Sequence, residues 1–182
     1  MKATGIVRKI DDLGRIVIPK EIRKALRIRI GDPLEIYVER NGEIILKKYK
    51  PLGDLLSICE QYAEALFKTT GFTCCISDME NIIAASGNSN KDYLDKELSN
   101  EVINIMEDRN IWFNKNMLSK NIIQIEKSLP KYTAEIISPI ICDGDAIGTV
   151  ILFSSEYGKK ITDVEIKLVQ SASIFLGVQM GQ

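Results

Sequence analysis

Turn signals lie so close together in the first fifty residues that this part of the chain can form only short elements. Strands are favoured where apolar and polar residues alternate, and Asn41-Gly42 is a strong signal for a tight hairpin. Pro19 ends one such run and suits the first position of a helix, where its missing N–H would have no partner. The pattern predicts a strand over 4–10, a turn over 11–14, a strand over 15–18, a helix over 20–26, and a hairpin of 34–39 with 43–48.

Fifty residues patterned in this way make a poor solitary domain. A lone hairpin is marginally stable in water, and so short a chain buries too little of its surface. We therefore expect residues 1–50 to pair with a second copy, so that each hairpin completes the sheet of its partner.

Charge divides the chain at the same place. Residues 1–50 hold 13 lysines and arginines against 7 acidic residues, a net charge of +6. Residues 51–182 hold 11 basic and 18 acidic residues, a net charge of −7. A continuous cationic surface binds a nucleic-acid duplex favourably, because binding releases counterions from the phosphates. This charge asymmetry therefore indicates that the N-terminal part binds a polyanion.

Three stretches of the N-terminal part closely resemble the AbrB family of bacterial transition-state regulators: Lys2–Arg23, Asp32–Val38 and Ile44–Lys50. The resemblance implies an interwoven swapped-hairpin dimer, mostly β, that binds double-stranded DNA at promoters. With its C-terminal part included, the chain resembles sporulation regulators of endospore-forming bacteria.

The same resemblance implies that Arg8, Arg15 and Arg23 grip DNA, with Lys9 beside them. Lys24 stands where the family commonly has a fourth arginine. Lysine lacks the bidentate fork of arginine, so we expect Lys24 to contact phosphate rather than to read a base. The residue pattern agrees, because three neighbouring elements present charge near one turn. The alternative is a basic face that only keeps the protein soluble.

Residues 51–54 are expected to form a short linker, and residues 55–182 are patterned as an α+β domain with an antiparallel sheet. Asp54 is a candidate cap for the first helix, and Thr162–Glu165 is a capping box for the last. The expected helices cover 54–68, 96–107 and 162–177. The expected strands cover 72–77, 82–86, 111–114, 122–125, 135–141 and 146–154, the last two joined by a turn at Asp143-Gly144.

This order of elements resembles the GAF family of small sensory domains, which often hold a ligand between the sheet and its capping loops. No ligand motif is present, so no cofactor and no ligand residue is assigned. Sensing of an unidentified small molecule and a purely architectural role remain equal alternatives. The first and last helices are apolar enough to pack against further copies, which together with the N-terminal dimer predicts a homotetramer.

The chain contains no histidine, which removes the usual general base and most zinc sites. Cys59, Cys74, Cys75 and Cys142 lack metal-binding spacing, so we expect reduced thiols, no metal site and no catalytic residue. We also expect no signal peptide and no membrane span. The expected location is the cytoplasm, associated with the nucleoid, and the forespore if the sporulation resemblance holds.

The sequence thus favours a sequence-selective DNA-binding transcription regulator of sporulation genes, not an enzyme. One alternative is an antitoxin that neutralises a toxin partner and regulates its own operon, since the swapped-hairpin fold serves such proteins too. Antitoxins usually append an extended acidic tail, whereas residues 51–182 are patterned to fold. A small enzyme in the C-terminal part is a third alternative, disfavoured by the missing histidine and nucleophile motifs.

Overall fold

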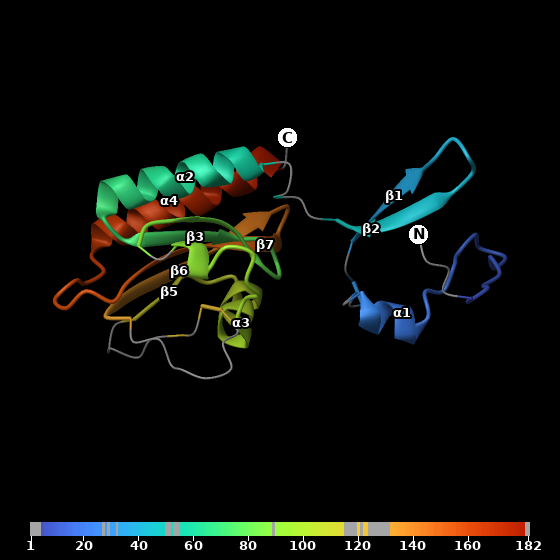
Figure 1. Cartoon of the computed structure of the whole chain (residues 1–182), viewed down its shortest axis with the longest axis horizontal. Helices are drawn as coiled ribbons and strands as arrows, with labels where there is room; N and C mark the ends of the chain where they lie inside the picture. Colours follow the sequence, from blue (N-terminus) through green and yellow to red (C-terminus); the bar gives the residue numbers. More distant parts are fainter. Residues whose placement is uncertain are drawn as a thin grey trace. The chain divides into compact units, whose positions relative to one another are not determined.

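The computed structural model describes residues 5–26, 28, 30–31, 33–49, 52, 55–88, 90–114, 120, 122–123 and 132–180 (Figure 1). The chain divides into two compact units, Met1–Tyr49 and Lys50–Gln182. Among the described residues, no helix is both long and apolar enough to cross a membrane.

The N-terminal unit consists of helix α1 (Lys20–Ala25) and a hairpin of strands β1 (Leu34–Val38) and β2 (Ile44–Lys48). The strands pair antiparallel, from Leu34 opposite Lys48 to Val38 opposite Ile44. Gly42 has φ 83° and donates its N–H to Glu39 O, which closes a three-residue turn with Gly42 in the left-handed region. The hairpin predicted at Asn41-Gly42 is therefore confirmed.

The two strands expected before α1 are wrong for this single chain: residues 5–18 form no strand, and residue 4 lies outside the described part. A strand exists only where a neighbour supplies the ladder of hydrogen bonds. Where the two arms meet, the Asp11 backbone N–H donates to Arg15 O at 3.0 Å.

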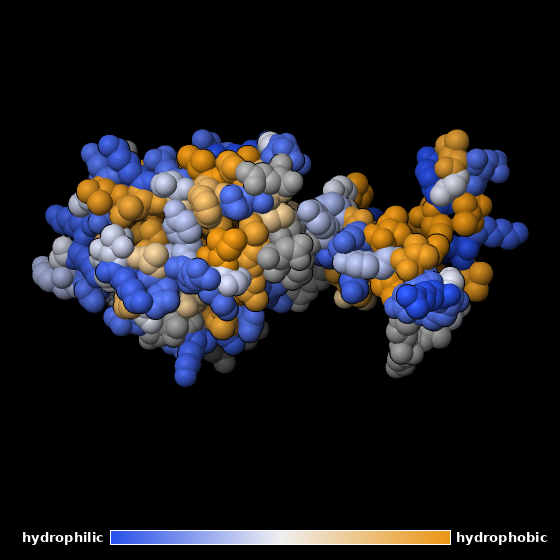
Figure 2. All heavy atoms as spheres, turned by 90° about the horizontal axis from the view of Figure 1, so that it is seen from above, coloured by the Kyte–Doolittle hydropathy of each residue, from blue (hydrophilic) through white to orange (hydrophobic). Residues whose placement is uncertain are grey.

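The N-terminal unit has almost no core of its own. Of its described residues only Pro19 is buried. Fourteen large apolar side chains are exposed instead: Ile6, Val7, Ile10, Leu13, Ile16, Val17, Leu26, Ile30, Ile36, Tyr37, Val38, Ile44, Leu46 and Tyr49. Figure 2 shows apolar atoms gathered at the surface of this unit. A monomeric soluble protein rarely exposes so much apolar surface.

The second unit is a five-stranded antiparallel sheet with the order β4-β3-β7-β6-β5. Its strands are β3 (Thr73–Ser77), β4 (Ile82–Ser86), β5 (Trp112–Phe113), β6 (Ala134–Cys142) and β7 (Asp145–Ser154). Its helices are α2 (Leu56–Thr70), the short 3₁₀ helix η2 (Asn90–Asp92), α3 (Asn100–Asp108) and α4 (Asp163–Met180). Helices α2 and α4 cover one face of the sheet, and α3 lies on the other (Figure 1).

Each face of this sheet carries its own core. On the α2 and α4 side the core includes Ile136, Leu152 and Leu176. On the α3 side it includes Val102, Ile137 and Ile151. Helix α4 approaches β6 most closely at Gly177, where an added Cβ would lie 2.1 Å from the carbonyl oxygen of Ile141.

The predicted turn and capping signals of this unit are confirmed where the structure describes them. Asp143 and Gly144 both have positive φ, 50° and 87°, as a two-residue hairpin turn requires. Thr162 N–H donates to the Glu165 carboxylate at 2.8 Å, so the capping box opens α4. The candidate cap Asp54 lies outside the described residues, and α2 is described from Leu56.

Helix α3 begins later than the predicted residue 96. Ser99 caps it by accepting the N–H of Val102 at 3.2 Å, while Glu97 and Leu98 form isolated bridges with Asn81 and Ile123. The strand predicted over 122–125 is represented by Ile123 in that bridge, and residues 124–125 lie outside the described part.

Candidate nucleic-acid interface

A tight turn between Asp11 and Arg15 organises the basic N-terminal unit. Gly14 has φ 75° and donates its N–H to Asp11 O at 2.9 Å. The Asp11 side chain accepts two further backbone N–H groups through Oδ1, from Leu13 at 3.0 Å and from Arg15 at 2.8 Å. Aspartate side chains commonly build turns in this way, because they bond the backbone two residues on.

The same carboxylate also holds the Arg15 side chain. Its Oδ2 accepts from Arg15 Nε at 2.8 Å, and the Arg15 side chain is still 69% exposed. Hydrogen bonds from the Arg15 backbone and side chain hold the pKa of Asp11 below its usual value. Asp11 is therefore ionised at neutral pH, and the two Nη groups of Arg15 remain available to a ligand.

The other four candidate residues lie on both sides of this turn. Arg8 and Lys9 are exposed on the arm before it, and Lys24 is exposed on α1. Arg23 is half-buried, and its backbone N–H donates to Pro19 O at 2.9 Å in the first turn of the helix. Within the described part of the chain, no acidic side chain forms an ion pair with any of these four.

The structure thus joins the Arg8 and Lys9 arm to Arg15 through the turn, and it places Arg23 and Lys24 in the last turn of α1. No described hydrogen bond links the helix residues to the turn residues. Asp11 was missed as a functional candidate. The signal was present in the sequence, because an aspartate three residues before glycine is a recognisable turn former.

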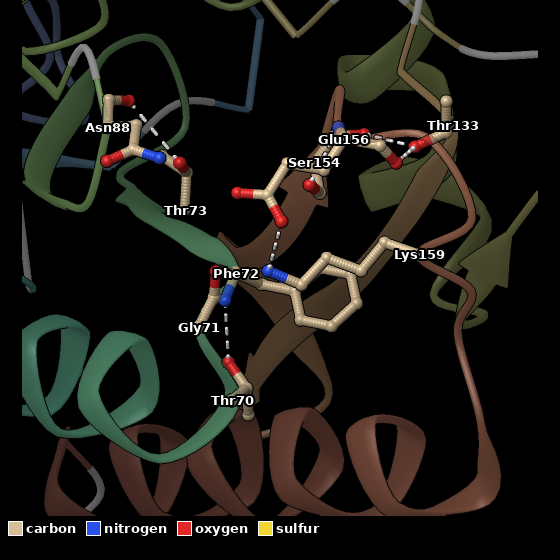
Figure 3. Close-up of polar contacts among 9 residues, drawn as sticks. All are labelled: Thr70, Gly71, Phe72, Thr73, Asn88, Thr133, Ser154, Glu156 and Lys159. Carbon is tan, nitrogen blue, oxygen red and sulfur yellow. Dashed lines mark hydrogen bonds and ion pairs between the residues drawn. The ribbon is translucent and has the colours of Figure 1, made fainter.

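Besides a cavity of about 760 Å³ that is lined in part by Phe113 and Lys159, the second unit has a smaller cavity of about 300 Å³ that could hold a small ligand. It is lined by Gly71, Thr73, Asn88, Tyr93, Phe153, Ser154, Ser155 and Glu156. Figure 3 shows polar contacts around it, and Lys159 stands out among them. The Lys159 ammonium donates to Gly71 O at 2.6 Å, pairs with Glu156 at 3.3 Å and lies 4.7 Å from the centre of the Phe72 ring. These contacts fasten the segment before α4 to the end of α2.

Several groups that might have suggested chemistry have structural roles instead. Cys59, Cys74 and Cys75 are buried, and burial raises the pKa of each thiol, to about 11 for Cys59. Asp78 accepts the N–H groups of Glu80 and Asn81 in the turn between β3 and β4. Among the described residues, no group of three His, Cys, Asp or Glu side chains could hold a metal ion.

Aromatic residues that could have lined a pocket belong mainly to the cores. Tyr93 and Trp112 pack against the α3-side core, and Phe113 packs against the other. Tyr93 also lines the cavity of about 300 Å³, and its hydroxyl oxygen lies 3.0 Å from that of Tyr132.

One buried acid was not anticipated. The Glu135 side chain is fully buried on β6. Its Oε2 accepts from the backbone N–H of Lys120 at 2.8 Å, while its Oε1 has no hydrogen-bond partner among the described residues. Desolvation raises the pKa of Glu135 to about 8, the Lys120 hydrogen bond lowers it, and the nearby Glu101 charge raises it further. Sequence pattern alone does not reveal it, because an acid within a strand is usually exposed.

Comparison with known proteins decides the family. A family model described as stage V sporulation protein T C-terminal, transcription factor, matches residues 54–181. Stage V sporulation protein T of Bacillus subtilis (strain 168) is 46% identical over 183 residues, which covers 100% of both chains. The chain belongs to the stage V sporulation protein T family.

Two further matches concern the N-terminal part of this family member. The transition state regulatory protein AbrB of Bacillus subtilis is 65% identical over 51 residues, 28% of this chain and 52% of that protein. A second family model, described as antidote-toxin recognition MazE, bacterial antitoxin, matches residues 7–54.

The GAF domain of a phosphoenolpyruvate-protein phosphotransferase from Acinetobacter matches with a TM-score of 0.57 and 9% identity. The match covers 69% of this chain and 81% of that domain, and it shows the fold of the C-terminal unit. The expected fold class is thus confirmed: an AbrB-type N-terminal domain and an α+β GAF-like domain with an antiparallel sheet.

Proposed function

We propose that this chain is a sequence-selective DNA-binding transcription regulator of sporulation genes. The proposed contacts with promoter DNA are Arg8, Lys9, Arg15, Arg23 and Lys24. One observation carries the proposal: within residues 1–50, whose net charge is +6, four of these five side chains have no acidic partner among the described residues. Unpaired cations on one small unit suit the phosphate ladder of a duplex. The relatives named above, a transcription factor family and a transition state regulator, support the same function.

The DNA-binding form is an interwoven dimer of residues 1–50. The two arms that lack a strand partner, and the exposed apolar residues around them, need a second copy to complete the sheet and bury its face. Ile36 and Val38 of β1 share one face of the hairpin with Ile44 and Leu46 of β2, and all four are exposed. Pairing two copies covers this face and doubles the charge of the DNA-binding surface.

The GAF-like unit, proposed to extend over 55–182 after a linker at 51–54, assembles or modulates the dimers. Helix α4 packs one side on the sheet, yet its outer side exposes Ile174 and Val178, at 65% and 55%. This face suits contact with another copy, so we propose a homotetramer of two N-terminal dimers. The cavity of about 760 Å³ that Lys159 lines and the smaller one of about 300 Å³ are each large enough for a small polar molecule, so both are candidate sites for a signal ligand.

The antitoxin alternative is supported by the match of residues 7–54 to an antitoxin model. It is weaker, because residues 55–180 contain a folded domain rather than an extended tail that wraps a toxin. We also propose that the protein is not an enzyme and that it acts in the cytoplasm on the nucleoid, in the forespore.

The test is binding of the full chain to duplex DNA selected by the wild-type protein from a random-sequence pool. Arg8→Ala and Arg15→Ala should each weaken binding at least about fivefold, since each removes a charge-assisted contact. Arg109→Ala is the matched control, because Arg109 is an exposed arginine of the GAF-like unit paired with Asp145. Particle mass, measured by analytical ultracentrifugation on the same samples, should be that of a tetramer for all variants.

Two results would contradict the proposal, and they bear on different parts of it. No enrichment of any duplex by the wild-type chain would overturn the proposed function. Loss of the oligomer in the Arg8 and Arg15 variants would show that these arginines are structural.

A further inference from the structure

We infer that Asp11 is a positioning residue for base recognition, which presets the Arg15 guanidinium before DNA is bound. This inference rests on the proposed function. An acid next to a DNA-binding surface is unfavourable for affinity, because it repels phosphate. Its presence in the turn therefore needs an explanation, and its contacts with Arg15 supply one.

The carboxylate of Asp11 holds Arg15 at both ends of the residue. Oδ1 accepts the backbone N–H of Arg15 and Oδ2 accepts its side-chain Nε–H, each at 2.8 Å. In return the Asp11 N–H donates to Arg15 O at 3.0 Å. A long side chain that is fixed at its backbone and at its guanidinium has few rotamers left to lose on binding.

The contact with Asp11 also selects which edge of the guanidinium faces outward. Nε is occupied, so the two Nη groups form the free edge, on a side chain that is 69% exposed. A bidentate pair with the O6 and N7 of guanine requires two parallel donors in a fixed orientation. Phosphate accepts a cation in many orientations, so fixing this edge favours base reading over phosphate binding.

Asparagine at position 11 separates this role from folding of the turn. The two backbone N–H groups that bind the Asp11 side chain, those of Leu13 and Arg15, both donate to Oδ1, which asparagine retains as an amide oxygen. Oδ2 would become an NH₂ group, which cannot accept from Arg15 Nε. Asp11→Asn therefore keeps the turn and releases the side chain of Arg15.

Asp12 offers a matched control. It is the adjacent acid, it is exposed, and its side chain makes no hydrogen bond or ion pair in the part of the chain that the structure describes. Asp12→Asn changes the net charge by the same amount as Asp11→Asn. Any effect of charge alone on phosphate affinity is common to both variants.

The experiment measures, for the full chain, the ratio of affinities for the selected duplex and for a random-sequence duplex. Asp11→Asn should lower this ratio about tenfold, within the discrimination of one bidentate arginine contact, while Asp12→Asn changes it by less than twofold. In an Arg15→Ala background, Asp11→Asn should have no further effect, because a positioning residue acts only through its partner. Protection of the Leu13 and Arg15 amides from hydrogen exchange reports whether the turn is kept.

A wild-type chain that binds no duplex overturns the proposed function and this inference with it. A wild-type chain that binds, with equal ratios in Asp11→Asn and Asp12→Asn, overturns this inference alone. An effect of Asp11→Asn that persists without Arg15 also overturns it, because the residue would then act on the turn rather than on the guanidinium.

Discussion

At the scale of single residues, two carboxyl groups of this chain are held in opposite states by their surroundings. Asp11 is exposed and is kept ionised by hydrogen bonds from Arg15. Glu135 is buried and is kept protonated at neutral pH mainly by the cost of desolvating its charge. Residue type alone would leave both groups ionised at neutral pH, so only the state of Glu135 departs from what residue type predicts.

Glu135 should make stability depend on pH. The pKa of this carboxyl is raised in the folded chain to about 8 from an ordinary value of 4.5, so between these pH values the folded state binds more protons than the unfolded state. The stability that protonated Glu135 contributes is therefore fully present below pH 4.5, and it is lost as the pH rises through about 8. Glu135→Gln keeps an acceptor for the Lys120 N–H and cannot ionise. We expect it to stabilise the fold at pH 8 by on the order of 1–3 kcal/mol and to flatten the profile.

The measurement is the free energy of unfolding in urea from pH 5 to pH 8.5. Glu60→Gln, at an exposed position of α2, controls for the loss of a surface charge. A Glu135→Gln profile parallel to that of the wild type would contradict the assigned pKa.

At the scale of elements, the C-terminal unit was predictable and the N-terminal arms were not. Strand β4 falls at the predicted 82–86, because its short apolar run and the turn before it are local signals. Helix α3 was predicted four residues too early, since the cap at Ser99 was not recognised and residues 97–98 join bridges to distant residues. The arms over 5–18 have strand-like sequence without a strand, because no neighbouring strand of this chain supplies their ladder of hydrogen bonds.

The candidate DNA-binding residues could be named from the sequence through the family resemblance. The contacts that hold their side chains in place could not. The bond from Arg15 Nε to Asp11 and the half-burial of Arg23 depend on how the turn and α1 fold. Lys159 contacts Gly71, which is 88 residues away in the sequence, and this contact can be identified only from the tertiary structure. Its ion pair with Glu156, only 3 residues away, could have been expected from the sequence.

Close packing of α4 on the sheet gives a prediction for the GAF-like unit. Gly177→Ala would place a Cβ 2.1 Å from the backbone oxygen of Ile141, and a backbone atom cannot turn away. We expect a loss of about 2–3 kcal/mol in unfolding free energy, from forced separation of α4 and β6. Ser171→Ala, at an exposed position of the same helix, should change stability by less than about 0.5 kcal/mol. Denaturant unfolding of both variants is the measurement, and equal midpoints would contradict the described packing.

At the scale of the whole molecule, charge and apolar exposure lie on the same unit. Residues 1–50 combine a net charge of +6 with fourteen exposed large apolar side chains, while residues 51–182 are acidic and contain two cores. In the proposed dimer, a second copy buries the apolar side chains and brings the cations of two units onto one surface. The net negative charge of residues 51–182 repels phosphate, so we propose that DNA contact is confined to the N-terminal unit.

The salt dependence of DNA binding tests this account most directly. Four phosphate contacts from each copy make roughly eight in the dimer, and at about 0.9 counterions released per contact, log K should fall against log salt with a slope of about −7. The measurement is a titration of the selected duplex with the full chain at several salt concentrations. A slope near −7, reduced by one to two units in Arg8→Ala, is the predicted result. A slope near zero, or one unchanged by Arg8→Ala, would contradict the account.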